Sequence, residues 1–330
     1  MIAGFEMFLV VAEELNISKA AQKVFVTQQC ASDHIRKLED QFGVKLFNRK
    51  PRLSLTAAGI VVQNNLLQMK AMEAAMKERL NEIKGEATGQ IRMGLNATRA
   101  RILLPNVLVQ YCNVFPNVQT SFVMNDTNIL EQLLLKNEID IFLGVNTSVT
   151  NPAFLRRELT KEDIYFLARA DFFSKKTGIS GDSIHKLLES GVELSRIRGF
   201  PIVRNQKNST INDLVDRYLM QCNVTLNSLT YIGDYDIQIA LCGSGFAAAF
   251  CPDIVLHRVM DYNKFRADSE RILAFPVVDI KEKLRIDIVT SMVIPMPQYM
   301  NTFIDCLCRE VLLKNNMSRK FQAEDRNINL

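Results

Sequence analysis

NISKAAQKVFVTQQCASDHIRKLEDQFGVKLFNRKPRLSLTAAG, residues 16–59, is the stretch that decides the fold of the amino-terminal part of this chain. It has the pattern of two short helices, a tight turn between them, and a basic hairpin. Ser18 is a good N-cap for the first of these helices, and Thr27 can cap the second. Apolar residues also recur at helical spacing over residues 3–15, which predicts a supporting helix upstream. Together these elements predict a winged helix-turn-helix, a fold that places one helix in the major groove of DNA.

The helix after Thr27 has an apolar face and a polar face. Four residues fall on one stripe and are expected to face inward: Ala31, Ile35, Leu38 and Phe42. Gly43 stands where a helix ends in a left-handed residue. On the polar side, glutamine can pair with adenine, arginine with guanine or phosphate, and serine with either. A solvated surface is the alternative, but the helix-turn-helix context favours DNA contacts by Thr27, Gln28, Gln29, Ser32 and Arg36.

The hairpin NRKPRLSLT carries the second set of candidate DNA contacts. Leu46 and Phe47 anchor it, and three cations gather at its tip: Arg49, Lys50 and Arg52. Between Asp40 and Glu73 the sequence has no acidic residue, so this region is locally basic in a chain of net charge +4. A plain solvated turn is the alternative. Beside a recognition helix, we interpret the hairpin as a wing that grips phosphates or enters the minor groove.

This segment resembles the LysR-type transcriptional regulators. The resemblance rests on Phe8, Ala20-Ala21, Thr27-Gln28, Ser32, Ile35, Leu38-Glu39, Gly43, Leu46-Phe47, Arg49 and Leu55-Thr56-x-x-Gly59. One departure is Gln29, which stands where relatives very often have proline, so the base preference at this end of the helix stays open. The resemblance implies a bacterial, cytoplasmic regulator that binds double-stranded promoter DNA, with RNA polymerase as a possible further partner.

A long helix is predicted after the hairpin, because residues 60–84 contain no glycine or proline. Apolar residues recur every three or four positions along it: Val62, Leu66, Met69, Met72, Met76, Leu80 and Ile83. Such a seam needs a partner, and we expect a homodimer contact over residues 60–84, with packing on its own domain as the alternative. The resemblance implies the same dimer and its assembly into a homotetramer. Gly85 and Gly89 flank a joint that marks the domain boundary.

After Gly89 the pattern changes to alternating strands and helices, which predicts an α/β fold with mostly parallel sheets. GQIRMGLNATRARILLP, FPNVQTSFVM, NEIDIFLGV and CGSGFAAAFCP resemble landmarks of the two-lobed, periplasmic-binding-protein-like effector domain of the same family. We expect a final helix over 297–313 and a frayed polar tail over 315–330. The expected division is 1–59 for the winged helix-turn-helix, 60–89 for the linker helix and hinge, 90–163 plus 268–330 for lobe 1, and 164–267 for lobe 2.

The expected effector site is the cleft between the lobes. Ligands of open α/β sheets bind beyond the carboxyl ends of strands, near helix amino termini, where hydroxyls and free amides can hold a carboxylate or phosphate. Residues at these points are Asn96, Thr98, Asp126, Thr127, Val145, Asn146 and Asn205. Ordinary helix capping is the alternative for each of them. We expect a small-molecule co-inducer whose identity the sequence does not reveal.

Composition and motifs narrow the other classes of function. The three histidines form no metal-ligand cluster, so we expect no metal and no cofactor. No nucleophile elbow, HExxH or dinucleotide fingerprint is present, so an enzyme is the least favoured alternative. The amino terminus lacks a basic start and a cleavage site, and no apolar run is long enough for a membrane span, so we expect neither a signal peptide nor a transmembrane helix. The seven cysteines form no CxxC, and we interpret them as reduced thiols. Redox sensing through Cys242 and Cys251 remains an alternative.

Overall fold

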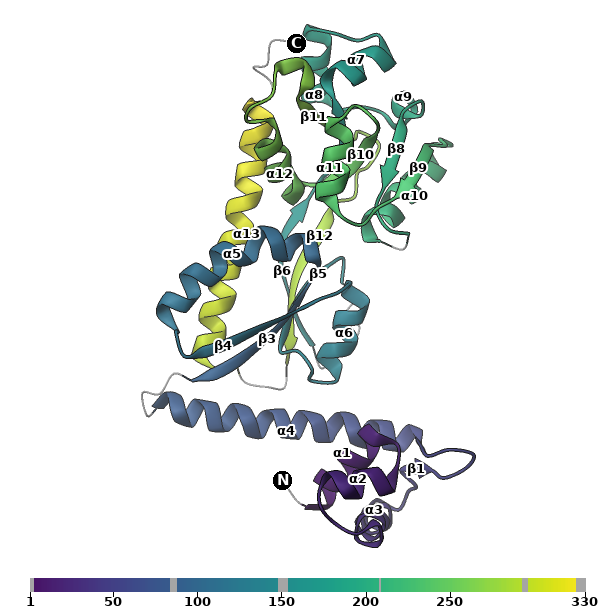
Figure 1. The fold of residues 1–330 in the computed structure, drawn as a ribbon, viewed down its shortest axis with the longest axis vertical. Coiled ribbons are helices and arrows are strands. Elements are labelled where there is room, and N and C mark those ends of the chain that lie inside the picture. The colour runs from purple at the N-terminus through teal and green to yellow at the C-terminus, as the bar shows by residue number, and fades with distance from the viewer. Residues whose placement is uncertain (1–2, 84–87, 148–153, 208, 293–295, 325–330) are drawn as a thin grey trace.

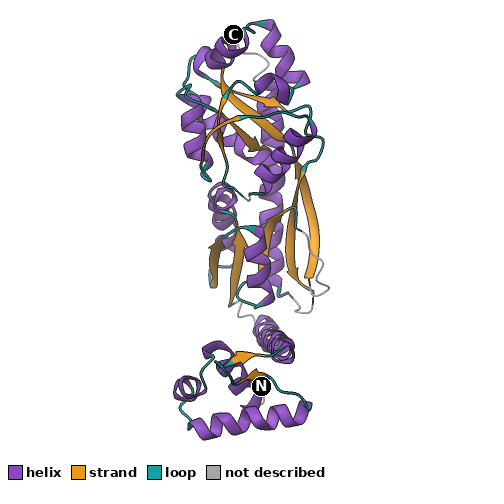
Figure 2. Cartoon of the chain, turned by 90° about the vertical axis from the view of Figure 1, so that its right-hand side faces the viewer, coloured by secondary structure: helices purple, strands orange, loops and turns teal. Residues whose placement is uncertain are grey.

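The computed structural model describes residues 3–83, 88–147, 154–207, 209–292 and 296–324. A small helical unit, a long helix and two α/β lobes follow one another along it (Figure 1). Figure 2 shows the strands of the two lobes as separate layers flanked by helices. Within these ranges, none of the helices combines the length and the apolar character that crossing a bilayer requires.

The amino-terminal unit is a winged helix-turn-helix. Its elements are α1 (Ala3–Glu14), α2 (Ile17–Lys23), α3 (Gln28–Phe42), β1 (Phe47–Asn48) and β2 (Ser54–Leu55). Its core contains Phe8 and Phe47, whose ring centroids lie 5.2 Å apart. Around them pack Val11, Ala20, Ala31, Ile35, Leu38 and Leu46, all buried. The small alanines let the three helices approach closely, as the sequence pattern predicts.

Two local predictions for this unit are wrong. The N-cap of α2 is Asn16 rather than Ser18, because the Asn16 side chain accepts hydrogen bonds from the amides of Ser18 and Lys19 at 3.0 and 3.1 Å. Phe42 is 43% exposed, because α3 has already passed the core at its last turn. The predicted ends of α3 are confirmed. The Thr27 hydroxyl accepts a hydrogen bond from the Cys30 amide, and Gly43 ends the helix with a φ of 68°.

The helix α4 (Ala57–Ile83) begins in close contact with the hairpin. The Thr56 hydroxyl donates to the carbonyl of Lys45 at 2.7 Å and accepts from the Gly59 amide at 2.9 Å. A Cβ atom at Gly59 would lie 2.1 Å from the carbonyl oxygen of Leu46. The Thr-x-x-Gly spacing therefore caps α4 and lets its first turn lie directly on the backbone before β1.

The apolar seam of α4 divides into two parts. Leu66 is 3% exposed and packs, with the half-buried Val62, into the core of the helical unit. The next four seam residues are exposed: Met69 by 50%, Met72 by 43%, Met76 by 56% and Leu80 by 51%. Packing within the chain thus explains only the first part of the seam. The side chain of Ile83 and residues 84–87 of the expected joint lie outside what the structure describes.

Lobe 1 is built on a mixed five-stranded sheet with the order β4-β3-β5-β12-β6. The strands are β3 (Gly89–Leu95), β4 (Val118–Met124), β5 (Ile141–Val145), β6 (Phe154–Glu162) and β12 (Leu284–Ser291). The helices are α5 (Ala97–Val114), α6 (Thr127–Leu135) and α13 (Gln298–Glu324). In Figure 1, α4 runs beneath this lobe, while α13 extends upward along it toward lobe 2.

Lobe 2 has a second sheet with the order β11-β7-β10-β8-β9. Its strands are β7 (Ile164–Arg169), β8 (Pro201–Arg204), β9 (Asn227–Tyr231), β10 (Ala248–Pro252) and β11 (Ile272–Pro276). Its helices are α7 (Ala170–Thr177), α8 (Asp182–Ser190), α9 (Leu194–Ile197), α10 (Thr210–Gln221), α11 (Tyr235–Gly243) and α12 (Asp253–Asn263). A short 3-10 turn, Asp268–Glu270, precedes β11.

Three expectations about the lobes need correction. The boundary at residue 268 is wrong, because β11 pairs with β7 and the chain returns to lobe 1 only between Pro276 and Leu284. The sheets are not mostly parallel. The chain crosses between the lobes after β6 and again after β11, and the pairs that these strands form, β6 with β12 and β11 with β7, are antiparallel. Finally, residues 315–324 continue α13 instead of fraying, and 325–330 lie outside the described residues.

Candidate nucleic-acid interface and interlobe cavity

The predicted DNA-contacting residues of α3 lie on its outer surface. Gln28, Gln29 and Arg36 are exposed, and Ser32 is half-buried at the edge of that surface. Thr27 is exposed but uses its hydroxyl as the cap of α3. Arg36 Nη2 lies 3.0 Å from Asp33 Oδ1, one turn back along the helix. An exposed pair of this kind holds the guanidinium weakly, so it remains free to contact a base or a phosphate.

Sequence reasoning missed two charged residues on the same surface. Asp33 and Lys37 follow Gln29 at intervals of four, and with Thr27, Cys30 and His34 they line a shallow groove of about 320 Å³. A carboxylate can accept from the amino group of cytosine, and an ammonium can bind guanine or phosphate. The signal was available in the sequence, because residues at i, i+4 and i+8 share one helix face. The outward surface of α3 is therefore wider and carries more charge than predicted.

A buried carboxylate positions the wing next to α3. Glu39 is 2% exposed and accepts hydrogen bonds from Lys45 Nζ at 2.8 Å and from the Leu46 amide at 2.9 Å. Burial alone would raise the pKa of Glu39, but these bonds and one from the Phe47 amide outweigh it and lower the pKa. The anion of Glu39 thus joins the end of α3 to the start of β1.

The wing itself presents its cations to solvent. β1 and β2 pair through Phe47 with Leu55 and Asn48 with Ser54, and the loop between them projects from the helical unit (Figure 1). Arg49, Lys50 and Arg52 in and beside this loop are all exposed. The structure therefore brings all eight predicted DNA-contacting residues to the surface of one small unit. Their contact with DNA remains a prediction.

The seven predicted effector-binding residues line one cavity between the lobes. Its volume is about 700 Å³, within the range of small-molecule sites. Lobe 1 contributes the amino-terminal ends of α5 and α6, and lobe 2 contributes those of α10 and α11. The predicted residues on its wall are Asn96, Thr98, Asp126, Thr127, Val145, Asn146 and Asn205. Their role in ligand binding remains a prediction.

Several of these side chains already bond to the backbone. Asn96 caps α5 by accepting from the Arg99 amide at 2.9 Å, and Asn146 Oδ1 accepts from the Arg285 amide at 2.7 Å. Thr127 Oγ1 accepts from the Val145 amide at 3.1 Å, which leaves its hydroxyl hydrogen for a ligand. Asp126 occupies the N-cap position of α6 without a side-chain capping bond. Helix capping, the alternative to ligand binding, therefore explains the Asn96 side chain but does not explain that of Asp126.

The sequence did not indicate the buried charge beside this cavity. Arg99, on the cavity wall, forms a bidentate ion pair with Glu162 at 2.9 and 2.8 Å. The two side chains are 2% and 0% exposed. Tyr235, Gln206, Ser209 and Thr210 of lobe 2 also line the cavity and were not predicted. They follow strands and begin helices as the predicted residues do, so the same rule applied to lobe 2 finds them.

The two cysteines of the redox alternative lie in the core. Cys242 and Cys251 are both 0% exposed. Burial raises the pKa of Cys242 to about 12 and raises that of Cys251 well above its usual value. Peroxide reacts with an accessible thiolate, and these are inaccessible neutral thiols. Over the described ranges, no group of His, Cys, Asp and Glu side chains is placed to hold a metal ion.

Two family models match this chain. Residues 2–60 match the bacterial regulatory helix-turn-helix protein family model, lysR family, and residues 84–269 match the LysR substrate binding domain. A probable RuBisCO transcriptional regulator of Thalassiosira pseudonana is 23% identical over 267 residues, which cover 77% of this chain and 82% of that protein.

Solved structures share the fold over nearly the whole length. A full-length OxyR variant from Pseudomonas aeruginosa has a TM-score of 0.63 at 17% identity, and the match covers 93% of this chain and 97% of that one. Full-length CbnR complexed with its target DNA has a TM-score of 0.53 at 18% identity, with coverage of 93% and 98%. At these identities the structural likeness establishes the fold and leaves ligand and target open.

Proposed function

This chain belongs to the LysR family of transcriptional regulators, with a helix-turn-helix DNA-binding unit and an effector-binding domain, and we propose that it binds promoter DNA as a symmetric assembly under control of a small molecule. The observation that carries the DNA part of this proposal is the exposed polar surface of α3 beside the three exposed cations of the wing. The helix supplies base contacts, and the wing supplies phosphate contacts that set its register.

The exposed part of the α4 seam supports a homodimer formed through residues 60–84. Four large apolar side chains in a row, from Met69 to Leu80, need a partner, and pairing two copies of α4 covers them. A two-fold pair then presents two α3 helices to two half-sites. We propose further assembly into a homotetramer, action in the cytoplasm and contact with RNA polymerase at the promoter. Full-length CbnR, which shares the fold, has been solved in complex with its target DNA, and this supports the DNA part of the proposal by analogy.

The interlobe cavity is the proposed effector site. Among the described residues on its wall, the only guanidinium is that of Arg99, which Glu162 already neutralises. The remaining groups are mainly hydroxyls, amides and helix amino termini, with the carboxylates of Asp126 and Glu131 on the lobe 1 side. We therefore propose a polar effector recognised by hydrogen bonds rather than by a cationic clamp.

Lobe movement is the proposed link between effector and DNA. Arg101 of α5 in lobe 1 lies 2.6 Å from Asp234, the N-cap of α11 in lobe 2. This exposed ion pair bridges the lobes near the cavity, and an effector that contacts both lobes favours one of their relative positions. The change alters the spacing of the two recognition helices in the assembly.

Binding to the promoter region upstream of its own gene tests the DNA proposal. We expect the full-length protein to protect a specific two-fold site in a footprint at moderate salt and to prefer it to a scrambled duplex of equal length. Equal affinity for both duplexes would overturn the proposal, because phosphate contacts alone do not distinguish sequences.

Ligand screening tests the effector proposal. A thermal-shift screen of metabolites on the full chain identifies candidates, since a ligand that binds only the folded state raises its stability. Calorimetric titration of a hit then compares Thr98→Ala and Thr127→Ala with Thr302→Ala, a hydroxyl on α13 outside the cavity. We expect weaker binding in the first two variants alone. Unchanged affinity in both would place the effector elsewhere.

A further inference from the structure

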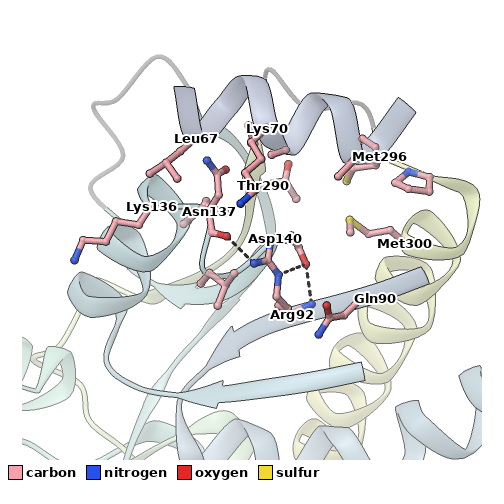
Figure 3. A pocket seen from close by; sticks show the side chains of 17 residues that line it. Leu67, Lys70, Gln90, Arg92, Lys136, Asn137, Asp140, Thr290, Met296 and Met300 are labelled. Carbon is pink, nitrogen blue, oxygen red and sulfur yellow. Dashed lines mark hydrogen bonds and ion pairs between the residues drawn. The ribbon is translucent and has the colours of Figure 1, made fainter. Parts of the chain in front are cut away.

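A second cavity lies between the linker helix α4 and lobe 1, and we call it the linker crevice (Figure 3). Its volume is about 370 Å³. The α4 wall is formed by Leu67, Lys70, Ala71, Ala74 and Ala75. The alanines leave room between the helix and lobe 1 that larger side chains would fill. The lobe 1 wall comes from the start of β3, the end of α6, the end of β12 and the start of α13.

The polar groups of the crevice combine a cation with an unused donor. Lys70 extends from α4 toward the lobe 1 groups, and over the described residues it forms no ion pair (Figure 3). The Asn137 Nδ2 atom is buried and has no hydrogen-bond partner in the structure. A buried amide without a partner costs free energy, which a ligand oxygen can recover.

The other two charged side chains at the centre of the crevice, Arg92 and Asp140, form an ion pair with each other. Arg92 bonds to Asp140 through Nη2 at 2.5 Å and through Nε at 3.2 Å, and its Nη1 donates to the Asn137 carbonyl at 2.7 Å. This pair is neutral as a unit. Lys136 stands at the rim and points away from the centre (Figure 3). The crevice is therefore lined by two exposed lysines, Lys70 directed toward lobe 1 and Lys136 at the rim.

Apolar side chains line the rest of the crevice. Leu67 lies toward one end, and Met296 and Met300 lie toward the other (Figure 3). Leu134 and Ile139 also line the crevice. Methionine side chains adapt to ligands of different shape because they are unbranched and polarisable. A ligand that fits these walls has a short hydrocarbon body and a single anionic head.

We propose that the linker crevice is a second ligand site, distinct from the interlobe cavity, that binds a small amphipathic monocarboxylate. The carboxylate accepts hydrogen bonds from Lys70 Nζ and Asn137 Nδ2, and the hydrocarbon body lies between Leu67 and Met300. The two sites differ in chemistry, since the interlobe cavity offers no free cation among its described lining residues.

The position of the crevice leaves it open in a dimer. At 100° per residue, Met69, Met72 and Met76 lie on the side of α4 opposite Lys70, Ala71 and Ala74. Pairing through the methionine side therefore leaves the crevice uncovered. A ligand in it contacts both α4, which continues from the DNA-binding unit, and lobe 1. Such a ligand favours the arrangement in which α4 lies against lobe 1 and so influences the orientation of the DNA-binding unit.

The test uses full-length protein and two simple carboxylates, hexanoate and cyclohexanecarboxylate, with their neutral amides for comparison. Ligand-observed NMR and calorimetry measure binding to the parent and to Lys70→Gln and Ala71→Leu. We expect the carboxylates to bind better than the amides, and Lys70→Gln to weaken carboxylate binding about tenfold, the effect of losing one charge-assisted hydrogen bond. Ala71→Leu, which fills the crevice, is expected to weaken carboxylate and amide alike.

Two control variants distinguish binding in the crevice from a general effect of charge on α4 and from binding in the interlobe cavity. Lys77→Gln removes the same charge from the same helix but does not line the crevice, and Thr98→Ala alters only the interlobe cavity. Parent-like affinity in both supports the proposal. The proposal is overturned if neither carboxylate binds, if Lys70→Gln binds like the parent, or if Thr98→Ala abolishes binding. DNA binding by each variant is measured separately, so failure here is distinct from failure of the proposed function.

Discussion

The Arg99 guanidinium and the Glu162 carboxylate form a bidentate ion pair that is almost wholly removed from solvent. Arg99 lies in the first turn of α5 on the wall of the interlobe cavity, and Glu162 is the last residue of β6 before the chain crosses into lobe 2. Burying two charges is costly unless each satisfies the other with good geometry. The pair therefore ties the cavity wall to the point at which the chain crosses from lobe 1 to lobe 2.

Glu162→Gln is expected to destabilise the effector domain by roughly 3–5 kcal/mol, because it leaves the Arg99 charge buried without a counter-ion. Urea denaturation followed by far-UV circular dichroism measures the loss. Glu158→Gln is the matched control, since Glu158 and Lys161 lie 3.7 Å apart with about half of each side chain exposed. It is expected to cost about 1 kcal/mol or less. Similar small losses in both variants would contradict this account of the buried pair.

Gly59→Ala is expected to destabilise the DNA-binding unit by about 1–3 kcal/mol through overpacking. Helix propensity alone predicts the opposite sign, since alanine favours a helix by about 1 kcal/mol over glycine. The new Cβ would meet the Leu46 carbonyl oxygen, which belongs to the backbone and cannot move aside. Thermal unfolding of the variant measures the change, with the exposed Ala57→Ser as a control in the same turn. A stabilised Gly59→Ala variant would show that the contact is not close.

Arg36→Ala and Arg52→Ala are expected to weaken DNA binding in different ways. Loss of Arg36 from α3 should reduce affinity for the specific site by about 1–3 kcal/mol and relax base preference at one position. Loss of Arg52 from the wing should weaken all sequences similarly and reduce the salt slope by about one. Titrations at several salt concentrations, on specific and scrambled duplexes, distinguish the two. Parent-like footprints in both variants would show that the DNA contacts are assigned to the wrong residues.

The stability of the effector domain is expected to fall as pH rises toward neutrality because of Asp253. Burial, together with the nearby carboxylates of Glu162 and Asp163, raises the pKa of Asp253 to about 7. In the unfolded chain this pKa is about 3.9, so between these values only the folded state holds the proton. The folded state therefore loses stability across that window, and the loss is complete above it.

Asp253→Asn tests this expectation, because an amide keeps an oxygen to accept from the Asp163 amide but does not titrate. Denaturation between pH 5 and 8 is expected to give a flatter stability profile than that of the parent. Asp213→Asn, which removes an exposed carboxyl on α10, serves as the control and should retain the parental slope. A parental slope in Asp253→Asn would assign the pH dependence to another group.

Met76→Lys is expected to dissociate the assembly without unfolding the chain. Met76 is 56% exposed in the single chain, so a lysine there is solvated in the monomer but buried in a dimer formed through α4. Sedimentation velocity measures the mass of the particle. Phe265→Lys provides the comparison, because Phe265 is 96% exposed and lies outside α4. A Met76→Lys protein with the parental mass would place the dimer contact on another surface.

Features of α3 and its neighbours were predictable because they depend on residues close in the chain. The cap at Thr27, the left-handed Gly43 and the buried stripe of Ala31 and Ile35 each follow from periodicity or from a bond over three or four residues. The seven cavity residues were predictable for a similar reason. Each lies at or just beyond the carboxyl end of a strand, where helix amino termini gather, so a general rule places them together.

Other features escaped prediction because they depend on segments far apart. Glu162 pairs with a residue 63 positions earlier, and nothing near either one signals a buried partner. The apolar run of β11 does not show which lobe this strand joins. Only its pairing with β7 shows that it belongs to lobe 2.

The sequence by itself determined the order of units, the winged helix-turn-helix with its exposed polar helix, and seven of the residues that line the interlobe cavity. These follow from caps, turn residues and hydrophobic periods, which act over a few residues. The tertiary structure alone decided the buried Arg99–Glu162 pair, the lobe boundary and the linker crevice beneath α4. Each of these arises where distant segments meet, and their free energy depends on shape and solvent exclusion that no local pattern encodes.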